Sequence, residues 1–201
     1  MPPEKTDALK SAVFTIPNLL SLFRILLVPV FLRAILGRRP SEALLIFVLA
    51  SLTDFLDGFT ARLWHQKSKL GMLLDPAGDK LLMTASFVVL TIPSLGVPNF
   101  IPLWLTGLVF ARDLMIVAGA VYAWRSWGQK TFTPSLLGKL STACQVGTVF
   151  LVLWLNHLRI TASYMPWAFR LTLLVTVASG AHYFASGLAI LREQRRGKTA
   201  A

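Results

Sequence analysis

The feature that most constrains this chain is a series of six apolar stretches, which together fill most of its 201 residues. A transmembrane helix needs about 20 predominantly apolar residues. The stretches lie at residues 18–36, 42–63, 76–93, 101–124, 135–155 and 167–191, and glycine- and proline-containing breakers fall between them. We therefore predict an all-α, multi-pass integral membrane protein with six transmembrane helices, forming one domain over residues 1–201.

The composition supports a bilayer rather than water as the surroundings. Hydrophobic residues make up 55% of the chain and charged residues 14%, whereas soluble domains carry about a quarter charged residues. The net charge of +11 suits nucleic acid, an anionic membrane or an anionic substrate. The hydropathy makes nucleic acid the least favoured partner. A single cysteine, Cys144, excludes an intrachain disulfide and a thiolate metal cage.

Basic residues between the spans predict the orientation in the membrane. Six spans place both termini on one side, and that side would hold eleven basic residues in its loops and tails. The opposite side would hold three, Arg38, Arg39 and Arg159. Because loops rich in lysine and arginine stay in the cytoplasm, we expect both termini there. Residues 1–15 then form a cytoplasmic juxtamembrane segment, and residues 192–201 form a basic cytoplasmic tail.

Acidic residues are concentrated where a membrane protein tolerates them least. Of nine in the chain, five lie in or at the ends of predicted spans: Asp54, Asp57, Asp75, Asp79 and Asp113. A carboxylate at membrane depth costs at least about 2.5 to 3.5 kcal/mol, so each one needs a cation, a proton or a water-filled cavity. Four of them fall within 26 residues and require a shared explanation.

The spacing of these four aspartates predicts two facing helix surfaces. Asp54 and Asp57 are three residues apart, so they share one face of the second span. Asp75 precedes Pro76, which is typical of a helix cap followed by proline at the first helical position, and Asp79 lies on the same face. The intervening residues are numerous enough for the two helices to pack side by side with the carboxylate pairs facing each other.

Four converging carboxylates favour divalent metal ions. Their mutual repulsion has to be neutralised, and oxygen ligands suit Mg²⁺ or Mn²⁺. A pair of ions about 3.5 to 4 Å apart is the usual clamp for displacement at phosphorus. Zinc is disfavoured, and nearby His65 is interpreted as structural. We predict a polar cavity that holds two metal ions and opens to the cytoplasm, where the loop after Arg62 is expected.

The segment around these aspartates resembles a known family signature. Residues 54–79 read DFLDGFTARLWHQKSKLGMLLDPAGD, which is similar to D-x2-D-G-x2-A-R-x8-G-x3-D-x3-D of the CDP-alcohol phosphotransferases. Every fixed position is filled. The resemblance implies phosphatidyl transfer from CDP-diacylglycerol to an alcohol with release of CMP, most often by a homodimer in a bacterial inner membrane.

The resemblance also implies roles for individual residues. Asp54, Asp57, Asp75 and Asp79 would bind the metal ions, and Asp79 would also take the proton of the acceptor hydroxyl. The small residues would admit the cytidine nucleotide, and Arg62 would neutralise the pyrophosphate. This nucleotide and pyrophosphate set comprises Asp54, Gly58, Ala61, Arg62 and Gly71.

The acceptor alcohol is less constrained. TIPNLLSLFR resembles the opening of bacterial phosphatidylglycerophosphate synthases, whose acceptor is glycerol 3-phosphate. GKLSTACQ partly resembles their GK-x-KT-x2-Q element, with Ser141 in place of a lysine. ARDLMIVAGAVY is instead similar to the fourth span of cardiolipin synthases of this fold, which use phosphatidylglycerol. We favour glycerol 3-phosphate, with phosphatidylglycerol as the alternative.

Two basic residues within the spans are candidates for binding an acceptor phosphate. Arg112 and Lys139 would do so in one interpretation, because buried cations need an anion. In the other interpretation, Arg112 pairs with a clustered aspartate and Lys139 reaches the cytoplasm. Arg24 is expected to face the polar cavity, whereas Lys80 and Asp113 have no assigned role.

Two other classes of protein also bury acids. A membrane transporter would place them in broken helices near the midplane, but it needs no alanine-arginine pair or fixed glycines at these offsets. An intramembrane prenyltransferase binds a diphosphate through aspartates and Mg²⁺, but its aspartate motifs lie far apart in the chain. Both classes are therefore less favoured than the phosphatidyltransferase.

Overall fold

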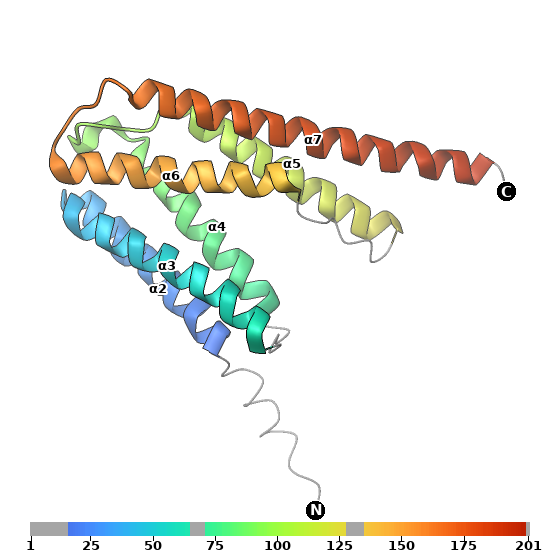
Figure 1. Cartoon of the computed structure of the whole chain (residues 1–201), viewed down its shortest axis with the longest axis horizontal. Coiled ribbons are helices and arrows are strands. Elements are labelled where there is room, and N and C mark those ends of the chain that lie inside the picture. The colour runs from blue at the N-terminus through green and yellow to red at the C-terminus, as the bar shows by residue number, and fades with distance from the viewer. Residues whose placement is uncertain (1–15, 65–70, 128–134, 200–201) are drawn as a thin grey trace, which may run out of the picture. The chain divides into compact units, whose positions relative to one another are not determined.

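The computed structural model describes residues 16–64, 71–127 and 135–199, and these residues are helical apart from short connections. They form six α-helices and one 3-10 turn (Figure 1). The elements are α2 (Ile16–Leu36), α3 (Pro40–Trp64), α4 (Gly71–Leu90), η1 (Pro93–Leu95), α5 (Leu103–Trp127), α6 (Leu136–Leu158) and α7 (Met165–Thr199). The all-α prediction is confirmed for the described part of the chain.

Each predicted span coincides with one helix, with two differences at the ends. Helix α4 begins at Gly71, so Asp75 and Pro76 lie within the helix and the prediction that Asp75 caps it was wrong. Helix α7 continues to Thr199, which makes the predicted basic tail helical for most of its length.

Three of the helices are long and apolar enough to cross a bilayer, judged over the described residues. These segments are Leu19–Leu36, Leu136–Leu158 and Met165–Leu188. Helices α3, α4 and α5 carry acidic residues within their apolar sequences, which lowers their hydropathy. The count of six spans therefore stays a prediction.

The described residues form two compact units. The first consists of residues up to Phe100 together with Phe150–Thr161, and the second of Ile101–Val149 together with the residues from Ala162 onward. Each unit consists of two separate segments of the chain, and α6 contributes residues to both units. The sequence prediction of one domain over residues 1–201 stays a prediction.

In the first unit α2 packs against both α3 and α4. Phe31 of α2 and Phe47 of α3 are fully buried, and their ring centroids lie 6.3 Å apart. Phe87 and Leu90 of α4 are also buried. Helix α2 therefore packs against both aspartate-bearing helices.

Two asparagines connect the end of α6 to the segment after η1 in the same unit. The backbone N–H of Asn99 donates to Asn156 Oδ1 at 2.8 Å, and Asn156 Nδ2 donates to the carbonyl of Asn99 at 2.9 Å. Asn99 Nδ2 also donates to the carbonyl of Ile160 at 2.7 Å. Both side chains are buried, so these bonds satisfy polar groups that would otherwise be costly.

In the second unit α7 packs against α5 and forms a polar seam with α6. Thr148 Oγ1 lies 2.6 Å from Thr172 Oγ1, and Ser141 Oγ lies 3.2 Å from Thr176 Oγ1. All four residues are buried. Small residues with hydroxyl groups allow close approach and hydrogen bonding between membrane helices. The seam therefore fixes the register of α6 against α7.

The described helices combine a buried apolar core with an outer surface that is also apolar. Large apolar side chains on the helices are widely exposed, among them Leu114 at 70% and Leu174 at 66%, while serines and threonines are buried between the helices. Trp104 and Trp167, near the starts of α5 and α7, are exposed as well. Such extended exposed apolar surface is typical of contact with lipid. We conclude that the chain is a membrane protein.

Candidate active site

The first aspartate of the motif forms an ion pair with an arginine of α2. Arg24 Nη1 lies 2.6 Å from Asp54 Oδ1. The Arg24 side chain is fully buried, whereas the Asp54 side chain is 46% exposed. The expectation that Arg24 faces a polar cavity stays a prediction, and the partner that the structure gives it is Asp54. Because one Asp54 oxygen is held while the carboxylate remains accessible, its orientation is fixed without closing it to a ligand.

The same arginine lies against α4, one residue before the last aspartate of the motif. A methyl group added to Gly78 would lie 3.4 Å from the carbonyl oxygen of Ser21 and 3.9 Å from Arg24 Cδ. Gly78 is buried, so the absence of a side chain allows α4 to approach α2 closely. Arg24 thus connects the Asp54 end of the motif on α3 with the Asp79 end on α4.

The side chains of the other motif residues lie outside the described part. This applies to Asp57, Gly58, Ala61, Arg62, Gly71, Asp75 and Asp79, although each belongs to α3 or α4. His65 lies between these helices and is also outside the description. Among described side chains no group of three or more potential metal ligands comes together. The predicted two-metal cluster therefore stays a prediction.

The second unit surrounds Arg112 of α5 with polar partners. Arg112 Nη1 donates to Asp113 Oδ1 at 2.8 Å, and Nη2 donates to Ser179 Oγ of α7 at 2.9 Å. The guanidinium carbon lies 5.7 Å from the centroid of the Tyr183 ring, within cation–π range. Arg112 is 8% exposed, and its Nε has no hydrogen-bond partner. Among the described residues the acidic partner of Arg112 is the adjacent Asp113, so pairing with a clustered aspartate and binding of an acceptor phosphate both stay predictions.

Tyr183 also contacts the start of α6, where Lys139 lies. The backbone N–H of Ser135 donates to Tyr183 Oη at 3.1 Å, and a methyl group added to Gly138 would lie 2.6 Å from the same oxygen. Lys139 follows Gly138 and is exposed. Among the described residues Arg112 and Lys139 share no direct contact, but Tyr183 contacts both the Arg112 guanidinium and the start of α6 at Ser135 and Gly138, next to Lys139.

Sequence reasoning missed the roles of Ser179 and Tyr183 as partners of Arg112. They are four residues apart on α7, and Thr172 and Thr176 continue the same helical face. This periodic row of polar residues in an apolar helix was the signal available. A methyl group added to the neighbouring Gly180 would lie 3.5 Å from Met115 Cε and 3.8 Å from Arg112 Cγ of α5, so the small residue allows α7 to approach α5 closely.

The comparison with protein families agrees with the motif. The family model of CDP-alcohol phosphatidyltransferases matches residues 14–178, which is most of the chain. It spans the aspartate motif, Arg24 and Arg112. The protein belongs to the CDP-alcohol phosphatidyltransferase family.

Two kinds of enzyme occur among its relatives. The chain is 41% identical over 144 residues to human cardiolipin synthase (CMP-forming), a match that covers 71% of this chain and 45% of the human protein. It is 29% identical over 187 residues to the Escherichia coli CDP-diacylglycerol--glycerol-3-phosphate 3-phosphatidyltransferase, covering 90% of this chain and 99% of that enzyme. The chain spans less than half the length of the human and rat synthases that it matches.

Proposed function

We propose that the protein transfers the phosphatidyl group of CDP-diacylglycerol to a hydroxyl group of a glycerol-containing acceptor and releases CMP. The observation that carries the proposal is the ion pair of Arg24 with Asp54 on α3, together with the close approach of α2 to α4 at Gly78, beside Arg24. These residues belong to the two ends of the complete family motif, so the contact supports a single site built from both helices. The matching family model supports the same conclusion.

Two divalent cations, Mg²⁺ or Mn²⁺, are part of this proposal. Asp54, Asp57, Asp75 and Asp79 would hold them, because a donor set of carboxylate oxygens suits these ions rather than zinc. The accessible, oriented carboxylate of Asp54 fits that role. When bound, the ions would neutralise charge on the pyrophosphate of the donor.

The proposed reaction is a displacement at phosphorus. Asp79 accepts the proton of the acceptor hydroxyl, and that oxygen forms a bond to the phosphorus attached to diacylglycerol. The bond from this phosphorus to the oxygen bridging to CMP breaks, and CMP leaves with the electron pair. Arg62 pairs with the pyrophosphate, while Gly58, Ala61 and Gly71 leave room for the nucleotide. Orientation and charge neutralisation supply most of the acceleration in such transfers.

Phosphatidylglycerol is the acceptor that the described residues favour. The Arg112 guanidinium already pairs with Asp113 at 2.8 Å, and Ser141 replaces a lysine of the glycerol 3-phosphate element and lies buried in the α6–α7 seam. The positive charge that remains therefore suits the monoanionic phosphodiester of phosphatidylglycerol better than a phosphate monoester dianion. The 41% identity to a cardiolipin synthase supports the same choice.

Glycerol 3-phosphate is the second candidate acceptor. The Escherichia coli enzyme whose name includes glycerol-3-phosphate matches the chain almost end to end. The two acceptors give different products from labelled CDP-diacylglycerol. We expect purified protein in detergent with Mg²⁺ or Mn²⁺ to form cardiolipin with phosphatidylglycerol. Formation of phosphatidylglycerophosphate with glycerol 3-phosphate alone would instead support the second acceptor.

The remaining proposals concern the setting of the enzyme. We propose a bacterial inner membrane, six spans and both termini in the cytoplasm, so that the soluble product CMP is released where nucleotides are recycled. The excess of basic residues on the predicted cytoplasmic side supports this orientation. A homodimer is proposed from the family resemblance.

A further inference from the structure

Helix α2 ends in a turn whose left-handed residue is an arginine. Arg39 N–H donates to the carbonyl of Ala34 at 2.9 Å and Arg38 N–H to that of Ile35 at 3.0 Å. This pair of bonds defines a helix ending that usually has glycine in the left-handed position. Here that position is Arg38, with a φ of 56°. Because a side chain makes this conformation unfavourable, an arginine here calls for an explanation.

The same ending occurs where α6 stops. Ile160 N–H donates to the carbonyl of Leu155 at 3.0 Å and Arg159 N–H to that of Asn156 at 3.2 Å. Arg159 has a φ of 57°. In the described ranges, these two arginines are the non-glycine residues with a positive φ. Both arginines belong to the predicted non-cytoplasmic side. An arginine therefore adopts this unfavourable backbone conformation twice at the same predicted membrane surface.

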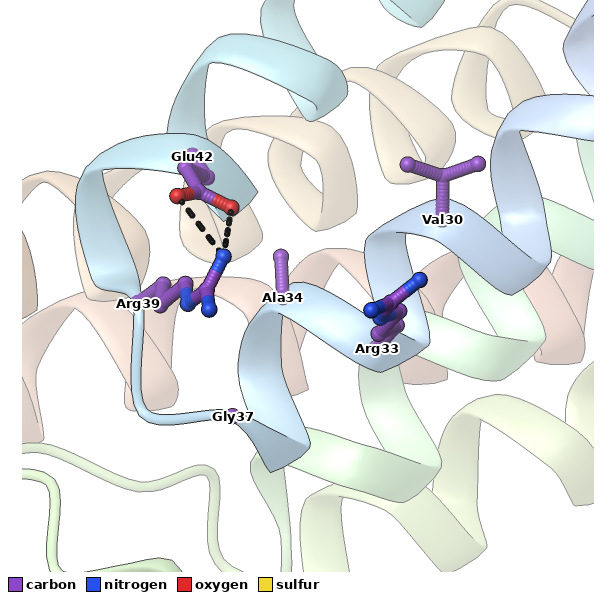
Figure 2. A pocket seen from close by; sticks show the side chains of 6 residues that line it. All are labelled: Val30, Arg33, Ala34, Gly37, Arg39 and Glu42. Carbon is purple, nitrogen blue, oxygen red and sulfur yellow. Dashed lines mark hydrogen bonds and ion pairs between the residues drawn. The ribbon is translucent and has the colours of Figure 1, made fainter.

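A pocket of about 330 Å³ adjoins the first of these turns. Its volume lies at the lower end of the range for small-molecule sites, about 300 to 1,000 Å³. Figure 2 shows that the last turns of α2 and the first turn of α3 supply its lining, with Ala34 between the two basic side chains. The lining residues are Val30, Arg33, Ala34, Gly37, Arg39 and Glu42.

The pocket carries an excess of positive charge. Arg39 Nη1 contacts both carboxylate oxygens of Glu42, at 3.3 and 3.4 Å, so these two charges offset each other. Arg33 has no acidic partner among the described residues. Arg38 in the adjoining turn does not line the pocket, since its guanidinium carbon lies 3.6 Å from where a methyl group on Gly96 would be. The lining therefore holds two cations and one carboxylate, and Arg33 is the cation that can bind an anion.

The position of the pocket defines the kind of anion. Arg33 lies within the last turn of the apolar segment Leu19–Leu36, where a spanning helix meets the lipid headgroups. Long basic side chains at this depth reach the phosphates of the bilayer surface. Val30 and Ala34 give the same pocket an apolar wall. Arg33 is about 14 Å along α2 from Arg24, at 1.5 Å per residue, so the pocket is separate from the candidate active site.

We propose that this pocket binds the headgroup phosphate of an anionic phospholipid, with Arg33 and Arg39 as the cations that contact it. Arg39 exchanges part of its contact with Glu42 for the phosphate, and an acyl chain lies along the apolar side of α2. The lipid in this pocket would be a bound component of the protein, whichever alcohol accepts the phosphatidyl group. The shared chemistry is a phosphate ester, which a lipid or a soluble metabolite could supply.

Native mass spectrometry of the full chain in neutral detergent tests this proposal. The probes are phosphatidic acid, phosphatidylcholine and glycerol 3-phosphate, in EDTA so that no divalent ion bridges a phosphate to the aspartates. We expect the first molecule of phosphatidic acid to bind at least about tenfold more tightly than the first molecule of phosphatidylcholine. The Arg33→Gln/Arg39→Gln variant should lose about a factor of five in affinity for each arginine, and glycerol 3-phosphate should not compete.

Matched variants distinguish a built site from general attraction to charge. Arg159→Gln removes a similar exposed arginine outside the pocket and should bind phosphatidic acid as the wild type does. Arg33→Lys/Arg39→Lys should retain most of the affinity. Unchanged binding in the glutamine variant, or an equal loss in Arg159→Gln, would overturn the proposal. Displacement by glycerol 3-phosphate would overturn it in favour of a soluble phosphate ester.

The activity of the same variants separates this inference from the proposed function. Arg33→Gln/Arg39→Gln should still release CMP from CDP-diacylglycerol, because the pocket is remote from Asp54 along α2. Wild-type protein that binds phosphatidic acid selectively but releases no CMP would uphold the lipid site and contradict the proposed reaction.

Discussion

The Nη1 atom of Arg24 lies 2.6 Å from Oδ1 of Asp54, and this ion pair joins a fully buried arginine to a carboxylate that is 46% exposed. The pair couples a helix outside the family motif to the first residue of that motif. An arginine in this position both lowers the local negative charge and holds one orientation of the carboxylate. Arg24 is therefore a positioning residue for the proposed site.

Replacement of Arg24 tests this role. We expect Arg24→Gln to lower turnover by about 10- to 100-fold, the usual effect of losing a partner behind a metal ligand. The dependence on Mg²⁺ or Mn²⁺ concentration should change together with turnover. CMP release over a range of metal concentrations measures both quantities. Arg33→Gln on the same helix is the matched control and should leave turnover and its metal dependence unchanged. Equal losses in both variants would show that Arg24 only supports the structure of α2.

Asp79→Asn tests the proposed base. The amide keeps the size of the side chain but cannot accept the acceptor's proton, so we expect turnover to fall by about 10²- to 10⁴-fold. CDP-diacylglycerol should still bind, because Arg62 and the other motif residues are retained. Single-turnover transfer and binding of labelled CDP-diacylglycerol measure the two effects separately. Near-normal turnover in this variant would show that another group accepts the proton.

Arg112→Ala tests the proposed acceptor site. Loss of a charge-assisted hydrogen bond to the acceptor phosphate should raise the KM for phosphatidylglycerol by about tenfold or more, with a smaller change for CDP-diacylglycerol. The control is Arg170→Gln, which alters an exposed α7 arginine that stacks on Trp167 at 4.8 Å. Initial rates with each substrate varied in turn give both constants. An equal rise in both KM values would favour a purely structural role for Arg112.

The contact between α6 and α7 gives a stability prediction. A methyl group at Gly138 would lie 2.6 Å from Tyr183 Oη and 3.1 Å from Cε2, so Gly138→Ala has to displace the ring from Arg112. We expect a loss of about 1 to 3 kcal/mol in the free energy of unfolding, as for other overpacked positions. The midpoint of thermal unfolding in detergent measures it.

Two further variants make the Gly138 prediction specific. Gly147 lies on the same helix and has no atom within 4 Å of an added methyl group, so Gly147→Ala should retain or raise the midpoint. Tyr183→Phe removes the closest contact, and we expect its combination with Gly138→Ala to be less destabilised than the sum of the single changes. Additive losses would contradict the contact.

The sequence predicted the helices well because long apolar runs separated by glycine and proline leave few alternatives to membrane helices. It placed the helix start wrongly at Pro76, because proline after an aspartate is a common start signal but α4 already begins at Gly71. The expectation that Arg24 faces a polar cavity came from the cost of burying a charge, but the sequence did not identify Asp54 as its partner. By contrast, the contacts of Arg112 with Ser179 and Tyr183 depend on how α5 packs against α7, which no local pattern specifies.

The central claim is tested most directly by CMP release from CDP-diacylglycerol by purified protein, measured with phosphatidylglycerol in the presence of Mg²⁺ or Mn²⁺ and again in EDTA. We predict acceptor-dependent release that requires the divalent ion and is lost in Asp79→Asn. Release that persists in EDTA, or that is unaffected by Asp79→Asn, would contradict the proposed aspartate-based mechanism.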